Sequence, residues 1–482
     1  MSEVSMQAPQ EVFRYFQEIS DIPRCARHTK EISDYIVNFA KEHGLTYDQD
    51  DLNNVIIYAD GTEGYEDADA VMLQGHIDMV AAKTEDSDHD FTKDPLELYV
   101  DGDLIRAKNT TLGADDGIAV AMMLAVLDGK DIPHPPLECV FTVDEEIGML
   151  GAEGLDGSKL KTKKILNLDS EEEGILTVGC AGAVDLYAHI PTARETVSGT
   201  GYHYEVKGLL GGHSGSDIHM ERAHAANLTA RVLMEAGRKA AFRIVTLSGG
   251  EVTNAIMNKV VGELVVKKGE EQAFEQAVAE ITETVRAEYR TADPDMVFLT
   301  EKKGEVTEEA LTEESQKTVL SYLNILPLGV QQTSLDLGGM PETSVSMGIL
   351  RLEGEEFYSG SMARSMVNSR RDHLADQIQL MTELVGGTLE RKGEYGAWEF
   401  NPNSRLLDIC TEVYEKQYGE KPVSGAVHAG VECGKWAEKL GEIDAVSLGP
   451  DMRNVHTFNE YLSISSTART WEYLKNVLKA CR

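Results

Sequence analysis

Histidines and carboxylates stand at or near the ends of several short apolar runs, and this placement limits the possible folds of the 482-residue chain. Runs rich in β-branched residues alternate with segments of helical periodicity. Such alternation predicts an α/β fold with a mostly parallel mixed sheet flanked by helices. Ligand sites in these sheets form beyond the carboxyl ends of the strands. The predicted strands cover residues 54–58, 71–74, 139–143 and 164–168, and the predicted helices cover residues 11–22, 29–43 and 117–127.

Metal-binding residue types follow three of the predicted strands. His76, the pair Glu145 and Glu146, and Asp169 each stand at a predicted carboxyl end. His76 and Asp78 are two residues apart, so in an extended segment both side chains leave the same face and the carboxylate can orient the imidazole. Neighbouring residues on a strand point in opposite directions. One of the two glutamates can therefore bind a metal ion while the other accepts a proton in metal-assisted hydrolysis.

A second acidic pair, Asp115 and Asp116, opens the predicted helix at residues 117–127. One of them suits a helix cap, because a short acidic side chain there satisfies unpaired backbone N–H groups. The other is better explained as a bridge between two cations about 3.5–4 Å apart. Taken singly, each candidate residue also fits an ordinary turn, cap or loop. Their order and placement together favour a two-metal site.

The next good candidate after Asp169 is His456, so a large segment separates the two. We expect a catalytic domain formed by residues 1–186 and 402–482, interrupted by an inserted α+β domain at residues 187–401. The insertion has strand signals at residues 202–210, 259–266 and 345–352, and helix signals at residues 223–236, 274–289 and 371–384.

Composition limits the expected partners and location. The chain has 82 Asp and Glu against 45 Lys and Arg, a formal net charge of −37, which disfavours binding to nucleic acid and to anionic lipid. The six cysteines are scattered singly, which is typical of a reducing compartment. The sequence shows neither a signal-peptide pattern nor an apolar run of membrane-spanning length. We therefore expect a cytoplasmic protein without a nucleic-acid or membrane partner.

Taken together, the motifs resemble those of the M20 metallopeptidases, and within that family those of the aminoacyl-histidine, or Xaa-His, dipeptidases. The resemblance covers nearly the whole chain. It rests on Gln74-Gly75-His76-Ile77-Asp78-Met79-Val80, Thr111-Leu112-Gly113-Ala114-Asp115-Asp116-Gly117, Thr142-Val143-Asp144-Glu145-Glu146-Ile147-Gly148-Met149, Gly211-Gly212-His213-Ser214-Gly215, His428-Ala429-Gly430-Val431-Glu432-Cys433-Gly434 and Val455-His456-Thr457.

The resemblance implies a centre of two divalent metal ions, Zn²⁺ with Mn²⁺ and Co²⁺ as alternatives. The implied ligands are His76 and Asp169 on one ion, Glu146 and His456 on the other, and Asp115 bridging both. Asp78 would orient His76, and Glu145 would be the general base that activates a water held between the ions.

The inserted segment is similar to the lid domain of that family. By this resemblance His213 would steady the oxyanion, Asn254 would contact the substrate, and Arg364 would hold the terminal carboxylate of the peptide. An arginine suits that task because its fork donates two parallel hydrogen bonds. Two departures from the family pattern, Met257 in place of a usual proline and Arg222 near a usual glycine, concern substrate contacts rather than metal ligands.

The expected activity is hydrolysis of unblocked dipeptides, including Xaa-His dipeptides such as β-alanyl-histidine, by a homodimeric enzyme. Two alternatives stay open. One is another M20 activity, such as that of a carboxypeptidase or an N-acyl amino-acid deacylase. The other is a catalytically inactive protein that binds metal or peptide.

Overall fold

The computed structural model describes residues 2–482, which divide into two compact units. Among the described residues, unit 1 comprises residues 2–179, Phe400–Ala426 and Val431–Arg482, and unit 2 comprises Cys180–Glu399 and Val427–Gly430. Unit 1 is therefore built from both ends of the chain. The sequence does not predict the brief return of Val427–Gly430 to unit 2.

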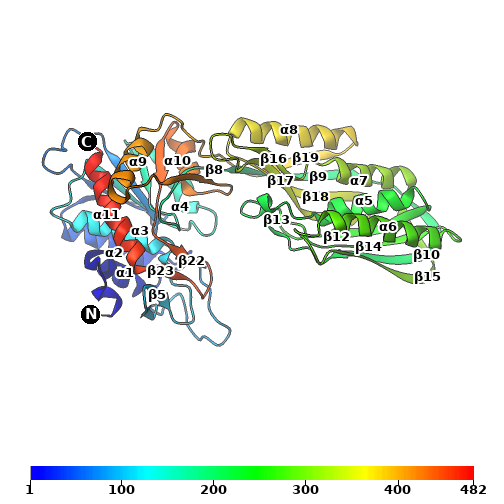
Figure 1. The fold of residues 1–482 in the computed structure, drawn as a ribbon, viewed down its shortest axis with the longest axis horizontal. Coiled ribbons are helices and arrows are strands. Elements are labelled where there is room, and N and C mark those ends of the chain that lie inside the picture. Colours follow the sequence, from blue (N-terminus) through cyan, green and yellow to red (C-terminus); the bar gives the residue numbers. More distant parts are fainter. Residues whose placement is uncertain (1) are drawn as a thin grey trace. The chain divides into compact units, whose positions relative to one another are not determined.

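The centre of unit 1 is an eight-stranded mixed sheet with parallel strands in the middle (Figure 1). The neighbours of β3 (Val71–His76) are β6 (Leu137–Thr142) and β7 (Lys164–Asn167), and both pair with it in parallel. All residues of β3 and β6 are buried, as is typical of strands covered on both faces. The other strands are β1 (Thr46–Gln49), β2 (Val55–Ala59), β21 (Asp444–Ser447), β8 (Ile175–Cys180) and β20 (Val423–Val427), and the order is β1-β2-β6-β3-β7-β21-β8-β20.

Helix α3 (Ala114–Asp128) contacts both β3 and α1 (Gln10–Ser20). Almost every residue of α3 after the first turn is buried, so this helix is apolar on all sides, as expected of a helix inside a core. Unit 1 also contains α2 (Lys30–Glu42), α4 (Leu150–Gly154), α9 (Arg405–Tyr418), α10 (Glu432–Leu440) and α11 (Ile464–Ala480). A small four-stranded sheet has the order β22 (Met452–Arg453), β23 (Tyr461–Ser463), β5 (Leu104–Ala107) and β4 (Leu98–Asp101).

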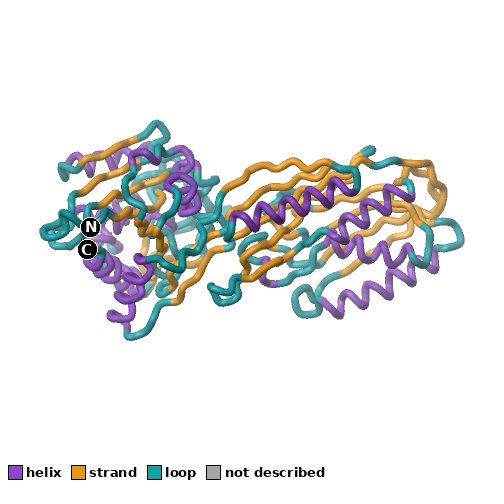
Figure 2. Tube along the Cα trace, turned by 90° about the horizontal axis from the view of Figure 1, so that it is seen from above, coloured by secondary structure: helices purple, strands orange, loops and turns teal. Residues whose placement is uncertain are grey.

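Unit 2 is built on a nine-stranded sheet, and its helices lie along the strands (Figure 2). Helix α5 (Ala225–Gly237) packs on β10, β12 and β14, whereas α8 (Asn368–Leu384) packs on β9, β18 and β19. The strands are β9 (Gly182–Pro191), β10 (Arg194–Lys207), β12 (Phe242–Gly249), β14 (Val260–Val266), β15 (Val297–Leu311), β16 (Gly329–Thr333), β17 (Pro341–Glu353), β18 (Glu356–Ser365) and β19 (Thr388–Tyr395), with α6 (Glu271–Glu288) and α7 (Glu313–Ile325) as further helices.

The predicted mixed α/β fold is confirmed, with the parallel strands in unit 1 and an antiparallel sheet with helices in unit 2. Across residues 2–482, the structure contains no helix with both the length and the apolar character needed to cross a membrane.

Candidate metal centre

Three of the five candidate ligands lie at or just beyond the carboxyl ends of three parallel neighbours, β6, β3 and β7. His76 is the last residue of β3, and Asp169 follows the last residue of β7 by two positions. Glu145 and Glu146 stand in the loop after β6. Parallel strands end at the same edge of a sheet, so the topology brings these side chains together.

Asp115 lies between two imidazoles. Its Oδ1 atom is 3.0 Å from Nε2 of His76, and its Oδ2 atom is 3.1 Å from Nε2 of His456. His456 Nε2 is also 2.9 Å from Oε2 of Glu146, and His76 Nε2 is 3.8 Å from Oδ1 of Asp169. The structure thus brings together all five side chains that the sequence suggests as metal ligands.

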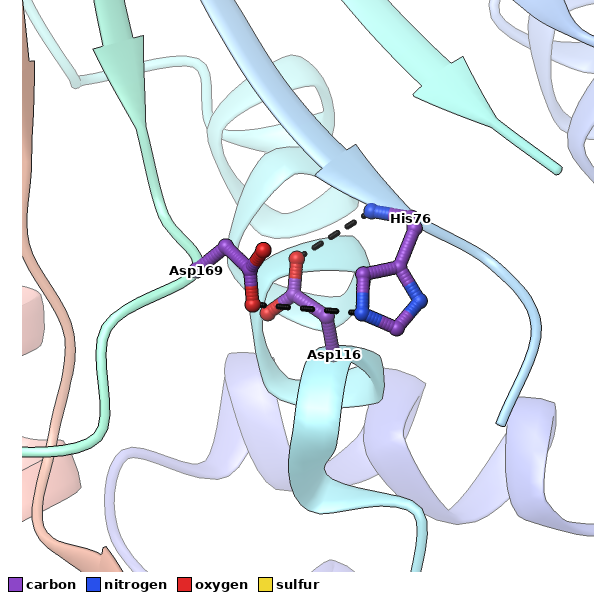
Figure 3. A group of neighbouring side chains, drawn as sticks. All are labelled: His76, Asp116 and Asp169. Atoms are coloured by element: carbon purple, nitrogen blue, oxygen red, sulfur yellow. Dashed lines mark hydrogen bonds and ion pairs between the residues drawn. The ribbon is translucent and has the colours of Figure 1, made fainter. Parts of the chain in front are cut away.

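Asp116 lies in the same cluster, although the sequence gives it only a possible capping role. One ligand atom each from His76, Asp116 and Asp169 lies within 4.8 Å of the others, and their side chains face one another (Figure 3). The Asp116 carboxylate is fully buried, and its Oδ2 atom accepts the backbone N–H of His76 at 3.1 Å. The alternative that one aspartate of the pair is a helix cap is not supported, because the carboxylate of Asp115 faces two imidazoles and that of Asp116 binds the backbone of β3.

Asp78 connects the end of β3 to the loop after β6. Its Oδ1 atom is 3.5 Å from Nδ1 of His76 and accepts the backbone N–H of Glu145 at 3.1 Å. Its Oδ2 atom accepts the backbone N–H of Glu146 at 3.3 Å. Nδ1 of His76 is also 3.2 Å from the backbone carbonyl of Asp78, so this buried residue lies against a candidate ligand and binds the backbone of the glutamate pair at the same time.

The two histidines hold protons strongly in the metal-free protein. Hydrogen bonds to Asp115 and Glu146 raise the pKa of His456 to about 11. Burial alone would lower the pKa of His76, but hydrogen bonds to Asp115 and Asp78 raise it well above its usual value. Burial also raises the pKa of Asp116 and of Asp169 well above the usual value, so carboxyls of the cluster hold protons more strongly as well.

Glu145 has a different environment from its neighbour. Burial raises the pKa of this carboxyl to about 8, and the nearby carboxylates of Glu432, Glu146 and Asp115 act in the same direction. A carboxylate whose pKa lies near neutral pH can accept and then return a proton during a reaction.

The chemistry of the donor atoms fits a pair of divalent cations. Imidazole nitrogens and carboxylate oxygens are the ligands of Zn²⁺, Mn²⁺ and Co²⁺ in proteins. Two buried oxygens of the cluster, Oε1 of Glu146 and Oδ1 of Asp116, have no hydrogen-bond partner among residues 2–482. A bound cation would satisfy an acceptor of this kind, whose burial is otherwise unfavourable.

The three residues that the family resemblance assigns to substrate gather within unit 2. Arg364 is buried and donates hydrogen bonds from Nε to Oγ of Ser214 at 3.1 Å and from Nη1 to the hydroxyl of Tyr395 at 3.0 Å. The backbone N–H of Ser214 donates to the carbonyl of Asn254 at 2.8 Å. Burial, and then the charge of Arg364, lowers the pKa of His213, and its Nδ1 atom accepts the backbone N–H groups of Gly215 and Ser216, both at 3.2 Å.

His428 belongs to the same group, although the sequence analysis assigns it no role. It lies in the returning segment Val427–Gly430, and its Nε2 atom is 2.7 Å from Oγ of Ser344. Burial lowers its pKa to about 3, with Arg364 and His213 contributing. The motif at residues 428–434 makes the segment recognisable in the sequence. Its partner Ser344 lies on β17, 84 positions earlier, so the sequence does not show the contact.

The match to a known family covers most of the chain. Residues 72–480 match the model of peptidase family M20/M25/M40. The chain belongs to this family. As an M20 peptidase it is a hydrolase that acts on peptide bonds, and the resemblance drawn from the motifs is confirmed.

Two dipeptidases are similar to this M20 chain along their whole length. It is 34% identical over 481 residues to the cytosol non-specific dipeptidase of Escherichia coli (strain K12), covering 99% of each sequence. The crystal structure of aminoacylhistidine dipeptidase from Vibrio alginolyticus matches with a TM-score of 0.93 at 35% identity, covering 99% of this chain and 98% of that one. The aminopeptidase PepT from Bacillus cereus ATCC 10987 shares the fold, with a TM-score of 0.57 at 16% identity and 99% coverage of each chain.

Proposed function

We propose that this M20 chain is a metal-dependent dipeptidase that hydrolyses unblocked dipeptides, with Xaa-His dipeptides among its substrates. The observation that carries the proposal is the position of Asp115, whose two oxygens face His76 and His456 separately. A carboxylate in this position can bridge two cations. The similarity of the whole chain to two dipeptidases supports the substrate class.

In this proposal the two cations are zinc ions, and the same donor set also accepts Mn²⁺ or Co²⁺. When bound, two such cations polarise a carbonyl oxygen and lower the pKa of water. The proposed ligands are His76 and Asp169 for one ion, Glu146 and His456 for the other, and Asp115 for both.

Glu145 is the proposed general base. Its carboxylate takes a proton from the attacking water and then delivers a proton to the leaving amino group. Its raised pKa supports both halves of this task near neutral pH. Asp78 supports the base indirectly, because it accepts the backbone N–H of Glu145.

Unit 2 is the proposed lid, and its residues bind the ends of the substrate. Arg364 pairs with the terminal carboxylate of the dipeptide, a role supported by a guanidinium already held by Ser214 and Tyr395. His213 donates to the developing oxyanion, and Asn254 contacts the substrate. We further propose that the enzyme works as a homodimer in the cytoplasm.

The test compares substrates on one preparation loaded with Zn²⁺. We expect hydrolysis of alanyl-alanine and β-alanyl-histidine, and much slower cleavage of their N-acetylated forms. Faster cleavage of the N-acetylated forms would identify a deacylase instead. An absence of turnover on all of them, with two ions bound, would identify a binding protein.

A substitution of the base separates catalysis from metal binding. E145A should lower kcat by about 10²–10⁴-fold while the content of bound zinc stays at the wild-type value. A matched control is E153Q, which changes an exposed glutamate of α4. Unchanged turnover in E145A would contradict the proposed base.

A further inference from the structure

We infer that Arg24 and Glu460 form a buried clamp of positioning residues that sets the spacing of the proposed metal ligands. The clamp holds the start of α3, and with it Asp115, in register with the segments that carry His76 and His456. This inference rests on the proposed function, because its purpose is to hold a two-cation centre.

Glu460 ties the loop of His456 to the start of α3. The carboxylate is 3% exposed. Its two oxygens accept four consecutive backbone N–H groups, those of Leu112 at 2.7 Å, Gly113 at 3.0 Å, Ala114 at 2.8 Å and Asp115 at 3.3 Å. These N–H groups belong to the turn that leads into the regular part of α3, because Asp115 and Asp116 have non-helical backbone angles. Buried N–H groups need an acceptor, and the carboxylate of Glu460 supplies it.

The loop that joins the proposed ligand His456 to the clamp residue Glu460 is short. Glu460 follows His456 by four positions, and its backbone N–H donates to the carbonyl of Thr457 at 3.1 Å. The N–H of Thr457 in turn donates to the carbonyl of Asn454 at 3.2 Å. These turns connect His456 and Glu460 closely, so a shift of the carboxylate also moves the imidazole relative to Asp115.

Arg24 holds the same turn from its other side. It is 2% exposed, and its Nη1 atom donates to the carbonyls of Ile77 and Asp78, both at 3.1 Å. Its Nη2 atom donates to the carbonyl of Gly113. The residue Gly113 is thus bound at its N–H by Glu460 and at its carbonyl by Arg24. The guanidinium therefore connects the end of β3, next to His76, to the start of α3.

Two glycines of the motif at residues 113–117 make room for the clamp. A Cβ atom added to Gly113 would lie 2.6 Å from Nη2 of Arg24, and one added to Gly117 would lie closer still. Gly113 also has a φ of +65°, which disfavours other residues. Both added Cβ atoms would meet the same Nη2 atom, so the two glycines face the same guanidinium. The two glycines of this motif therefore leave the space that the guanidinium of Arg24 occupies beside the helix.

The positive charge of Arg24 and the negative charge of Glu460 stabilise each other in the protein interior. Arg24 interacts with the carboxylates of Glu460, Asp78, Asp116 and Asp115. A buried charge without a partner is strongly unfavourable. Glu460 and Arg24 bind the N–H and the carbonyl of the same residue, Gly113, so their opposite charges lie near each other. The clamp can therefore fix the proposed ligands without making the cluster still more negative.

The test measures zinc binding by the metal-free protein, by competition with a chelator, and the number of ions bound per chain. The variants are E460Q and R24K. Glu138 offers a matched control, because it is a carboxylate 4% exposed that accepts the backbone N–H groups of Lys161 and Thr162 at 3.0–3.2 Å. It lies near the amino end of β6, whereas the proposed ligands lie beyond the carboxyl end.

In E460Q and R24K we expect the affinity for at least one zinc ion to fall about 10–100-fold. E138Q should bind two ions with wild-type affinity even if its melting temperature falls as far as that of E460Q. Wild-type affinity for both ions in E460Q and R24K overturns the clamp, whatever their activity. Failure of the wild-type chain to bind two ions overturns the proposed function instead.

A third variant covers the case in which E460Q does not fold. G117A crowds the guanidinium but keeps both charges, and alanine favours a helix over glycine by about 1 kcal/mol. The clamp predicts weaker zinc binding in G117A despite that gain. Unchanged affinity in both R24K and G117A overturns the inference.

Discussion

The carboxylate of Asp78 accepts the backbone N–H of Glu145 at 3.1 Å. The distance from the same carboxylate to Nδ1 of His76 is 3.5 Å. A proposed ligand at the end of β3 and the proposed base in the loop after β6 thus both lie against one buried side chain. Precise placement of reacting groups of this kind contributes strongly to catalysis.

Substitution of Asp78 should therefore impair both metal binding by His76 and catalysis by Glu145. In D78N, the single carbonyl oxygen of the amide cannot replace two carboxylate oxygens. We expect kcat/KM for a dipeptide to fall about 10–100-fold, and zinc affinity to fall as well. Steady-state kinetics and zinc competition measure the two effects. Wild-type values for both quantities would show that Asp78 has no positioning role.

Loss of the proposed bridge should remove a metal ion. In D115N, the amide presents only one oxygen, so one of the two imidazoles loses its facing carboxylate oxygen. We expect the zinc content of dialysed protein to fall from two ions to about one per chain. Elemental analysis measures this content. D156N, at an exposed cap of a short 3-10 helix, should retain two ions. Full occupancy in D115N would argue against bridging.

Metal binding should release protons and weaken as the pH falls. A cation must displace the protons of His456, whose pKa is raised to about 11, and of His76, whose pKa is also raised. Because the pKa of His456 lies far above neutral pH and that of His76 is shifted in the same direction, each decrease in pH favours the proton over the cation. Calorimetry in buffers of different ionisation enthalpy measures the release. A binding constant that does not change between pH 6 and pH 8 would refute this prediction.

Arg364 should contribute to binding of the substrate carboxylate. A lysine keeps the charge but cannot form the two parallel hydrogen bonds of the guanidinium. We expect R364K to lower kcat/KM about 10–100-fold, mainly through KM, because a hydrogen bond to a charged group contributes roughly 1.5–3 kcal/mol. R391K is a suitable control, since Arg391 on β19 pairs with Asp376 on the surface. An equal decrease of kcat/KM in R364K and R391K would exclude a specific role of Arg364 in binding the substrate carboxylate.

Gly75 should be required because Asp116 approaches it closely. A Cβ atom at this position would lie 2.6 Å from Oδ2 of Asp116 and 2.7 Å from Cβ of Ala119. We expect G75A to lower the free energy of unfolding by about 1–3 kcal/mol. Denaturant titration measures the loss. G157A is the control, because the nearest atom to its added Cβ is 3.4 Å away. Equal free energies of unfolding for G75A and G157A would show that a Cβ atom at position 75 is not crowded by Asp116.

The buried strands of unit 1 could be predicted from the sequence, and there is a physical reason for it. Strands covered on both faces are continuous apolar runs, so the predicted segment 71–74 falls within β3 and the segment 164–168 nearly coincides with β7. The edge strand β1 has exposed and half-buried residues only. A short polar strand of this kind leaves no hydrophobic pattern to detect.

Most candidate ligands could be found because each stands next to a recognisable strand or helix, whereas His456 was assigned as a ligand through the resemblance to the family. Glu460 and Arg24 could not be found in this way. Both bind backbone groups of segments far away in the sequence, and a backbone N–H or carbonyl carries no residue identity. The role of Asp116 was missed for the same reason, since its partner is the backbone N–H of His76.

The position of β21 has a consequence for synthesis of the protein. This strand comes from residues near the end of the chain, yet it lies between β7 and β8, which are made much earlier. On the ribosome, the edges of β7 and β8 stay open while unit 2 emerges, and such edges invite pairing with other chains. His456 emerges only after β21. A nascent chain therefore completes its sheet before it gains the last histidine of the cluster, so truncated products cannot form the whole centre.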